Sequence, residues 1–338
     1  MKNKHISAVV LAAGKGTRMQ STQAKVLHEI LSEPMIHHVL ESISVLNLSR
    51  TVVVTGHQHK NVESALSDHK VTFAKQDEQL GTGHAVLCAE KKVPKNNGTV
   101  LILCGDTPLI TPETLQKFID SHRDSKATLS VMTTHLEDPT NYGRIVTDDD
   151  HNIICIVEEK DANESARLIN EINAGIYCVD SNFLFEALKQ VGTDNQQGEI
   201  YLTDIVAIAK RDELPLRRFI CKDPVEIMGV NSRLELATAH RFMQERRNQE
   251  LMENGVTLVN PTSIAIEKSV RIDKDTVVNS NVHIGGKTTI GKGCSIGDNS
   301  VIKDCSIGKN VTIGPLVYLE GVTIKDNEVV KPHQTQCK

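Results

Sequence analysis

The sequence predicts an α/β domain followed by a short left-handed parallel β-helix, and two observations carry that prediction. Over residues 1–230, apolar runs that suit buried strands alternate with segments of helical spacing, which is typical of an α/β domain with a mostly parallel central sheet. Beyond residue 256, aliphatic residues recur every six positions instead. We therefore expect a first domain over 1–230, a linker helix over 231–255 and a β-helix over 256–338.

Apolar runs bounded by glycine or polar residues predict the strands of the first domain. They are ISAVVLAAG from Ile6, and residues 51–56, 99–106 and 127–134. Helical spacing follows Pro34 within residues 25–43, and Pro34 can be the first residue of that helix. Because ligands bind at the carboxyl ends of strands in such sheets, the loop 13–18 and Asp106 are expected to meet at one edge.

A single helix is predicted over residues 232–254, where it joins the two folded parts. Ser232 and Glu235 have the S-x-x-E spacing of a capping box, which marks the start of a helix. Gly255 stands where a left-handed residue commonly ends one.

A six-residue aliphatic repeat follows this helix, and its register slips by one residue at two places. Its members are Ile266, Ile272, Val278, Ile284, Ile290, Ile296, Ile302, Ile307, Ile313, Leu319, Ile324 and Val330. Such a repeat is typical of a β-helix with short strands and tight corners. With three hexads to a coil, as in left-handed β-helices, it predicts a little under four coils that fade at Val330. The flat faces of such a solenoid commonly stack against copies of the same chain.

Two glycines and several cations follow the first predicted strand, in LAAGKGTRMQSTQAKVLHEI (residues 11–30). Gly14 and Gly16 allow a sharp turn and a close approach of backbone N–H groups to a ligand. The cations are Lys15, Arg18 and Lys25, which together suit a polyphosphate. The Walker A spacing is absent, and Met19 stands where the Rossmann fingerprint needs a third glycine. From these residues alone, a purely structural turn remains an alternative.

Composition excludes several classes of function. The formal net charge of −5 and the 3% aromatic content argue against general binding of nucleic acid or of anionic membranes. The eight cysteines form no C-x-x-C pair, so we expect reduced, buried thiols in a cytoplasmic protein rather than a disulfide framework or a zinc site. No apolar run suits a membrane span, and the N-terminal run is too short for a signal peptide.

A series of longer motifs gives the most specific information. In chain order they are LAAGKGTRM, KVLHEI, QLGTGHAV, CGDTPLI, YGRIV, IVEEKDA, EINAGIY, QGEIYLTDIV and GVNSRLEL. With these motifs the chain resembles the bacterial N-acetylglucosamine-1-phosphate uridylyltransferase family over its whole length. The resemblance implies an α/β nucleotidyltransferase domain with a Rossmann-like mixed sheet, a left-handed β-helix that forms homotrimers, UTP and a sugar 1-phosphate as substrates, and Mg²⁺ as cofactor.

The resemblance also implies contacts to the nucleotide. Arg18 and Lys25 would meet the phosphates as catalytic cations, because attack at the α-phosphorus builds negative charge that fixed cations stabilise. Nucleotide-binding positions are implied at Leu11, Ala13, Gly14, Gln76, Gly81 and Thr82. Gln76 offers a uracil both a donor and an acceptor, although the segment around it could be an ordinary loop.

Metal and sugar contacts follow in the same way. Asp106 and Asn231 match the family's metal ligands, and Mg²⁺ prefers oxygen donors with several waters. Without the resemblance, either residue could simply cap a turn or the linker helix. Sugar contacts are implied at Gly143, Glu158, Asn173 and, as a weaker candidate, Thr203.

The expected reaction is uridylyl transfer from UTP to N-acetylglucosamine 1-phosphate, which gives UDP-N-acetylglucosamine and pyrophosphate. Cys104, Ala24 and Glu159 depart from the residues common in the family, which leaves another sugar 1-phosphate as an alternative. A non-catalytic regulator that binds a nucleotide sugar is a second alternative. The family's acetyl-transfer groups lie on later coils, so no acetyltransferase activity is expected of residues 1–338.

Overall fold

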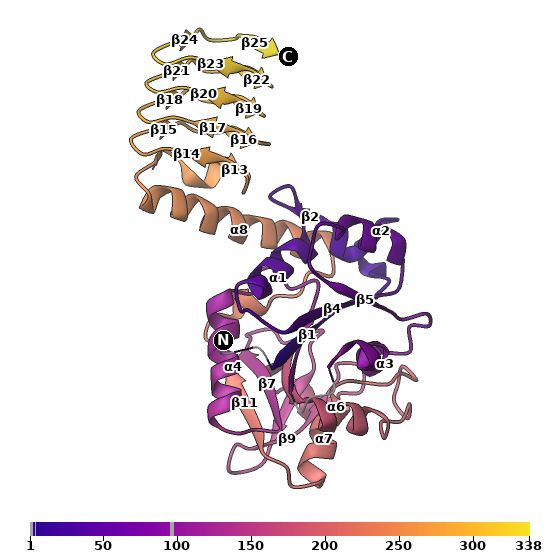
Figure 1. Cartoon of the computed structure of the whole chain (residues 1–338). Coiled ribbons are helices and arrows are strands. Elements are labelled where there is room, and N and C mark those ends of the chain that lie inside the picture. The colour runs from indigo at the N-terminus through magenta and orange to yellow at the C-terminus, as the bar shows by residue number, and fades with distance from the viewer. Residues whose placement is uncertain (1–2, 4, 95–97) are drawn as a thin grey trace. The chain divides into compact units, whose positions relative to one another are not determined.

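The structure is a computed structural model that describes residue 3, residues 5–94 and residues 98–338. Residue contacts divide the chain into two compact units. The first comprises Met1–His28 and Glu33–Leu236, and the second comprises Glu29–Ser32 and Ala237–Lys338. In Figure 1 the first unit shows helices around a central sheet, and the second shows a stack of short strands coloured orange to yellow.

A mixed sheet forms the centre of the first unit, in agreement with the predicted fold class. Its strands run in the order β11-β7-β10-β6-β1-β4-β5, and a hairpin of β8 and β9 is attached to β10. β1 pairs in parallel with β4 and β6, whereas β10 is antiparallel to β6 and β7. The bounds are β1 Ile6–Ala12, β4 Arg50–Thr55, β5 Thr72–Lys75, β6 Thr99–Cys104, β7 Leu129–His135, β8 Arg144–Thr147, β9 Ile153–Val157, β10 Glu171–Asp180 and β11 Leu216–Ile220.

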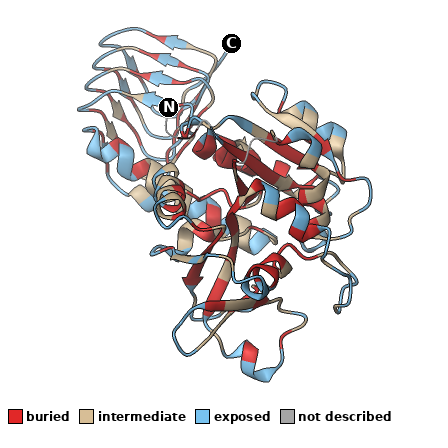
Figure 2. Ribbon diagram, turned by 60° about the horizontal axis from the view of Figure 1, so that its bottom comes forward, coloured by how far each residue is buried: buried red, intermediate tan, exposed pale blue. Residues whose placement is uncertain are grey.

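The central strands are buried on both faces, which explains why their sequences are continuous apolar runs. Along β1, Ala8 and Val10 belong to one buried cluster, and Val9 belongs to a second cluster on the opposite face. Accordingly, Figure 2 shows the strands of this sheet mostly in the colour of buried residues.

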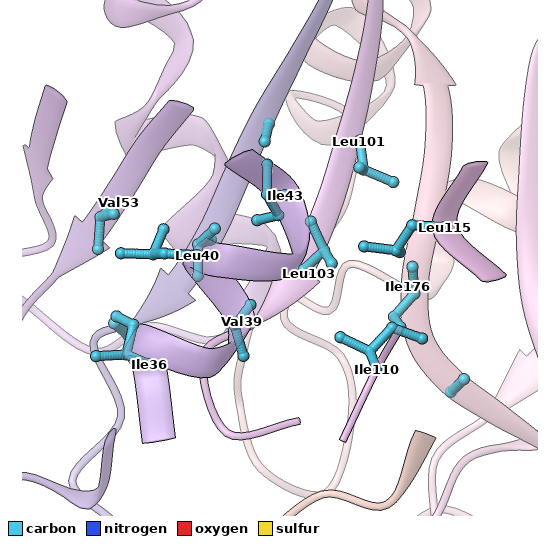
Figure 3. Packing of buried hydrophobic residues seen from close by; sticks show 14 of the residues in the cluster. Ile36, Val39, Leu40, Ile43, Val53, Leu101, Leu103, Ile110, Leu115 and Ile176 are labelled. Atoms are coloured by element: carbon cyan, nitrogen blue, oxygen red, sulfur yellow. The ribbon is translucent and has the colours of Figure 1, made fainter. Parts of the chain in front are cut away.

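Helices cover both faces of the sheet. Residues of α1 and α4 enter the first cluster, and residues of α3, α6 and α7 enter the second. Figure 3 shows Ile36, Val39, Leu40 and Ile43 of α1 near residues of the strands, at the spacing of one helix face. The helices are α1 Met35–Ser44, α2 His59–Ala65, α3 Thr82–Cys88, α4 Pro112–Asp124, α5 Glu164–Arg167, α6 Ser181–Leu188, α7 Asp204–Arg211 and α8 Arg233–Glu253.

Short elements lie between these helices and strands, and one of them corrects an expectation. They are the 3-10 turns η1 Thr17–Met19, η2 Lys25–Leu27, η3 Glu90–Lys92 and η4 Pro224–Ile227, and the strands β2 Glu29–Ile30 and β3 Glu33–Pro34. Pro34 is not the first residue of α1, as the sequence suggested. It precedes the helix with an extended conformation (φ −51°, ψ 139°), and the helix begins at Met35.

The predicted capping residues lie at the two ends of α8. The Ser232 hydroxyl accepts the Glu235 N–H at 3.2 Å, and the Glu235 carboxylate accepts the Asn231 N–H at 2.7 Å. Gly255 has a φ of +88°, as expected of a residue that ends a helix in the left-handed region.

The second unit is a parallel β-helix of the left-handed type that hexapeptide repeats form. Its aliphatic repeat points inward and, with the exception of the partly buried Ile272, is buried. Three sheets contain five, five and four strands, so the structure has more than the predicted "little under four" coils. The prediction missed β12, which precedes the regular repeat, and β25, where polar residues continue the stack. A 3-10 turn, η5 Pro261–Ser263, lies between the first two strands. The strands are β12 Thr257–Leu258, β13 Ala265–Ile266, β14 Arg271–Ile272, β15 Val277–Val278, β16 His283–Gly285, β17 Thr289–Ile290, β18 Ser295–Ile296, β19 Val301–Lys303, β20 Ser306–Ile307, β21 Thr312–Ile313, β22 Tyr318–Glu320, β23 Thr323–Ile324, β24 Val329–Val330 and β25 Thr335–Cys337.

Two further expectations concern the chain as a whole. None of the helices in the described residues is long and apolar enough to cross a bilayer. All eight cysteines are free thiols, and four of them are buried as expected. Cys88, Cys104 and Cys155 are only partly buried, and Cys337 is exposed because it lies on the outermost strand of its sheet.

Candidate active site

The glycine-rich loop after β1 packs its backbone directly against Lys25. Gly16 has a φ of +61°, and a Cβ atom there would lie 2.7 Å from the Cβ of Lys25. Only glycine therefore allows this turn without displacing the lysine. Gly14 has open space around its Cα, so its role is not set by a steric contact within the chain.

Lys25, Asp106 and Asn231 meet at one point, although they lie far apart in the sequence. The Lys25 ammonium is paired with the Asp106 carboxylate and donates a hydrogen bond to the Asn231 amide oxygen at 2.9 Å. Asp106 follows β6, and its backbone oxygen accepts the Val230 N–H at 2.8 Å, which brings the neighbouring Asn231 alongside. The Lys25 and Asp106 side chains are 15% and 14% exposed, so a ligand can still reach them.

The oxygens of Asp106 and Asn231 fit a divalent cation. Both converge on a single positive charge, the Lys25 ammonium. Within residues 3, 5–94 and 98–338, no cluster of three or more His, Cys, Asp or Glu side chains forms a metal site. Two oxygen donors with room for phosphate and water oxygens are what Mg²⁺ uses in nucleotide sites.

A cavity of about 410 Å³ opens beside this cluster at the carboxyl ends of β1 and β6. The predicted residues that line it are Leu11, Ala13, Gly14, Lys25, Gln76, Gly81, Thr82 and Asp106. The structure thus brings together all six predicted nucleotide positions, one predicted catalytic cation and one predicted metal ligand.

The amide group of Gln76 has a fixed orientation in this cavity. Its nitrogen donates to the Gly81 carbonyl at 3.0 Å and lies 3.1 Å from Nδ1 of His84. Gly81 has a φ of +109°, and a Cβ there would lie 2.5 Å from the Ile200 carbonyl oxygen, so only glycine fits. Thr82 lines the cavity, while its hydroxyl accepts the Leu202 N–H at 3.0 Å.

The four predicted sugar positions form a second group: Asn173 lies on β10, Gly143 and Glu158 lie beside the ends of β8 and β9, and Thr203 precedes α7. A Cβ added at Gly143 would lie 3.5 Å from the Glu158 carboxylate and 3.6 Å from the Cβ of Asn173. The Thr203 hydroxyl donates to Glu158 at 3.1 Å. Burial raises the pKa of Glu158, and the hydrogen bond from Thr203 acts in the opposite direction. Thr203 is itself buried, so it supports the Glu158 carboxylate from inside the protein.

Arg18, unlike the other predicted catalytic cation Lys25, does not line the cavity. Its side chain is exposed on η1. Burial raises the pKa of Tyr142, and the positive charge of Arg18 is among the groups that oppose this shift. A role on the phosphates would need the Arg18 side chain to turn toward the cavity.

Sequence patterns missed several residues that shape the site. Glu199, Gln79 and Cys104 line the cavity, and only Cys104 stood out, as a departure from the family. Arg233 donates to the Met19 carbonyl at 3.3 Å and to Nδ1 of His28 at 3.2 Å, which ties the glycine-rich loop to the start of α8. No motif spacing signals these residues, because their partners are distant in the sequence.

Comparisons with known proteins identify the families to which parts of the chain are similar. Residues 7–224 match the nucleotidyl transferase family, and residues 269–304 match the bacterial transferase hexapeptide family of six repeats. Bifunctional protein GlmU of Desulfotalea psychrophila is 49% identical over 265 residues, which cover 78% of each chain. The chain belongs to the GlmU family.

Other GlmU relatives are longer. Those of Geobacter metallireducens and Listeria monocytogenes are 49% and 47% identical over 78% and 77% of this chain, which spans only 56% and 57% of their length. A solved structure from Bacillus anthracis, assigned as a glucose-1-phosphate thymidylyltransferase, has a TM-score of 0.55 at 20% identity. The matched region covers 70% of this chain and 94% of the Bacillus anthracis chain. At this low identity the likeness supports the fold alone. The chain is therefore a nucleotidyltransferase of the GlmU family with a hexapeptide-repeat unit.

Proposed function

We propose that the first unit transfers a uridylyl group from UTP to N-acetylglucosamine 1-phosphate, with Mg²⁺, and releases pyrophosphate. The observation that carries the proposal is the convergence of Lys25, Asp106 and Asn231 beside a cavity of about 410 Å³. One cation and two oxygen donors at the mouth of a nucleotide-sized cavity are what phosphoryl chemistry on a triphosphate requires.

Each group of site residues has a separate role in this reaction. Bound Mg²⁺ would supply charge neutralisation on the phosphate oxygens, held by Asp106 and Asn231. Lys25 leaves these oxygens and turns its ammonium to the α-phosphate, where negative charge develops. Glu158 and Asn173 orient the sugar hydroxyls, so that the sugar phosphate oxygen attacks in line with the departing pyrophosphate. Because the substrate oxygen is already anionic, the attack needs no general base.

A pyrophosphate-release assay with a panel of sugar 1-phosphates tests the proposal and its alternatives. N-acetylglucosamine 1-phosphate is expected to give the highest kcat/KM with UTP and Mg²⁺. A higher value for another sugar 1-phosphate would support the changed-substrate alternative, in which Cys104 and Glu159 mark an altered pocket. UTP binding without turnover of any sugar would support a regulator.

The fixed Gln76 amide predicts selectivity for UTP over CTP. With its nitrogen held by the Gly81 carbonyl, Gln76 presents its oxygen to the base, where it accepts the N3–H of uracil. Cytosine has an acceptor at N3, so two acceptors would face each other in a buried site. The kcat/KM for UTP is expected to exceed that for CTP by at least about 100-fold.

The matched control is Gln76→Ala, which removes both amide atoms and leaves neither base favoured by hydrogen bonding. Its preference for UTP is expected to shrink, because kcat/KM for UTP falls more than kcat/KM for CTP. Equal kcat/KM values for UTP and CTP in the unmodified protein would refute this account of base recognition.

We propose that the β-helix assembles the chain into a homotrimer in the cytoplasm. It exposes the apolar side chains of Val329 on β24 and of Leu316 in the turn before β22, which are 69% and 50% exposed in the single chain. Light scattering of residues 1–338 is expected to give the mass of three chains, and removal of residues 256–338 is expected to give a monomer. A monomeric mass for residues 1–338 would contradict the proposal.

We also propose that residues 1–338 do not acetylate glucosamine 1-phosphate. Acetyl transfer from a thioester needs an enclosed base and donors for the oxyanion. The histidines of the second unit, His240, His283 and His333, are all exposed to solvent. No enzyme-dependent release of coenzyme A from acetyl-coenzyme A is expected, whereas release at a rate near that of uridylyl transfer would overturn the proposal.

A further inference from the structure

A buried arginine lies beside the proposed sugar contacts without belonging to them. Arg144, the first residue of β8, is only 2% exposed, and its guanidinium lies 2.7 Å from the Glu159 carboxylate. It also donates to the Tyr142 carbonyl. Burying a guanidinium is costly unless it is paired. The ion pair with Glu159 therefore constrains both side chains, although the Arg144 Nε has no hydrogen-bond partner among the described residues.

The backbone of Arg144 pairs β8 with β9 and β10, and three of the sugar contacts lie on or directly beside these strands. Arg144 pairs with Val157 of β9 on one side and with Ile172 of β10 on the other. The residues next to these three are Gly143, Glu158 and Asn173. The Asn173 N–H also donates to the Gly143 carbonyl at 2.8 Å. Three of the four proposed sugar contacts, Gly143, Glu158 and Asn173, are therefore adjacent to a residue in the Arg144 register.

The side chain of Arg144 adds a constraint where the strand pairing ends. Glu158 and Glu159 follow β9, beyond its last residue, Val157, so no strand ladder fixes them. The Thr203 hydroxyl holds the Glu158 carboxylate, and the Arg144 guanidinium holds the next residue, Glu159. The turn continues with the Asp161 N–H donating to the Glu158 carbonyl at 3.0 Å.

We propose that Arg144 is a positioning residue, which acts through Glu159 to set the Glu158 carboxylate for the sugar phosphate. This inference rests on the proposed function, since it assigns Glu158 to the sugar. The nucleotide contacts lie on or next to β1, β5 and α3, so their positions do not depend on the β8–β9 hairpin. Loss of Arg144 therefore weakens binding of the sugar phosphate and leaves binding of UTP intact.

Steady-state kinetics of Arg144→Met, Arg144→Lys and Glu159→Gln test this split. Arg144→Met is expected to raise the KM for N-acetylglucosamine 1-phosphate about 10-fold or more, with the KM for UTP unchanged within about 2-fold. Arg144→Lys, which keeps the charge, and Glu159→Gln, which keeps an acceptor, are expected to show smaller rises in the same KM. The control is Asp148→Asn. Asp148 lies between β8 and β9 on the same hairpin and forms a partly exposed ion pair of 3.3 Å with Lys210 of α7, so its loss should change neither KM.

Hydrogen exchange at the Asp161 amide gives a readout that needs no substrate. Arg144→Met is expected to speed this exchange at least about 10-fold relative to the unmodified protein and to Asp148→Asn. The inference would be overturned if Arg144→Met lost thermal stability and raised the KM values for UTP and for the sugar phosphate equally. Unchanged hydrogen exchange at the Asp161 amide would overturn it as well. If the unmodified protein turned over no sugar phosphate, the proposed function would fail, and the exchange measurement would still decide whether Arg144 holds this segment.

Discussion

Replacing Asp106 by asparagine is expected to lower kcat for pyrophosphate release by about 10²–10³-fold, the usual cost of one preorganised electrostatic element. The variant keeps the size of the side chain and one oxygen, but it loses the charge that pairs with Lys25 and would hold a divalent cation. Folding is expected to survive, since the side chain lies at the ligand-facing end of β6 and is partly exposed. Initial rates at saturating UTP and several Mg²⁺ concentrations measure the effect.

The control for this variant is Asp124→Asn at the end of α4, where the side chain is 74% exposed. It removes the same charge from the chain and is expected to leave kcat unchanged. A kcat for Asp106→Asn within about threefold of the unmodified protein at saturating Mg²⁺ would mean that Asp106 holds no essential cation.

Replacing Lys25 by methionine is expected to have an effect of similar size, about 10²–10³-fold on kcat. Methionine keeps much of the length of the side chain, so it preserves the packing against Gly16 while removing the ammonium. In the structure that ammonium occupies the same oxygens of Asp106 and Asn231 that a metal would use. Without nucleotide, the variant is therefore expected to bind Mg²⁺ more tightly than the unmodified protein, as calorimetric titration would show.

Lys117→Met, at an exposed position on α4, is the matched control and is expected to change neither quantity. The two readouts separate the roles of Lys25. Normal kcat would remove it from catalysis, and Mg²⁺ affinity no higher than that of the unmodified protein would show that Lys25 does not compete with the metal.

The sequence alone was enough to predict the main layers of the fold, because each layer has its own period. Continuous apolar runs predicted the buried strands around β1, and the six-residue repeat predicted the β-helix. The ends of that repeat were predicted less well. Leu258 precedes the regular spacing, and β25 has no aliphatic core residue, so a count of hexads gave too few coils.

Parts of the candidate site followed from where strands end. Asp106 follows β6 and the glycine-rich loop follows β1, so parallel pairing of these strands puts both at one edge. The link between Arg144 and Glu159 could not be predicted in this way. Both residues look like ordinary surface charges in the sequence, and only the register of β8, β9 and β10 buries the guanidinium. The exposed position of Arg18 was equally unpredictable, because it depends on how η1 turns out of the loop.

Pyrophosphate release by the unmodified protein, with UTP, N-acetylglucosamine 1-phosphate and Mg²⁺, is the most direct test of the central claim. The account predicts steady turnover that requires all three components, stops when the metal is chelated and returns when Mg²⁺ is added back. Absence of release with every sugar 1-phosphate tested, from protein that binds UTP and is folded, would contradict it.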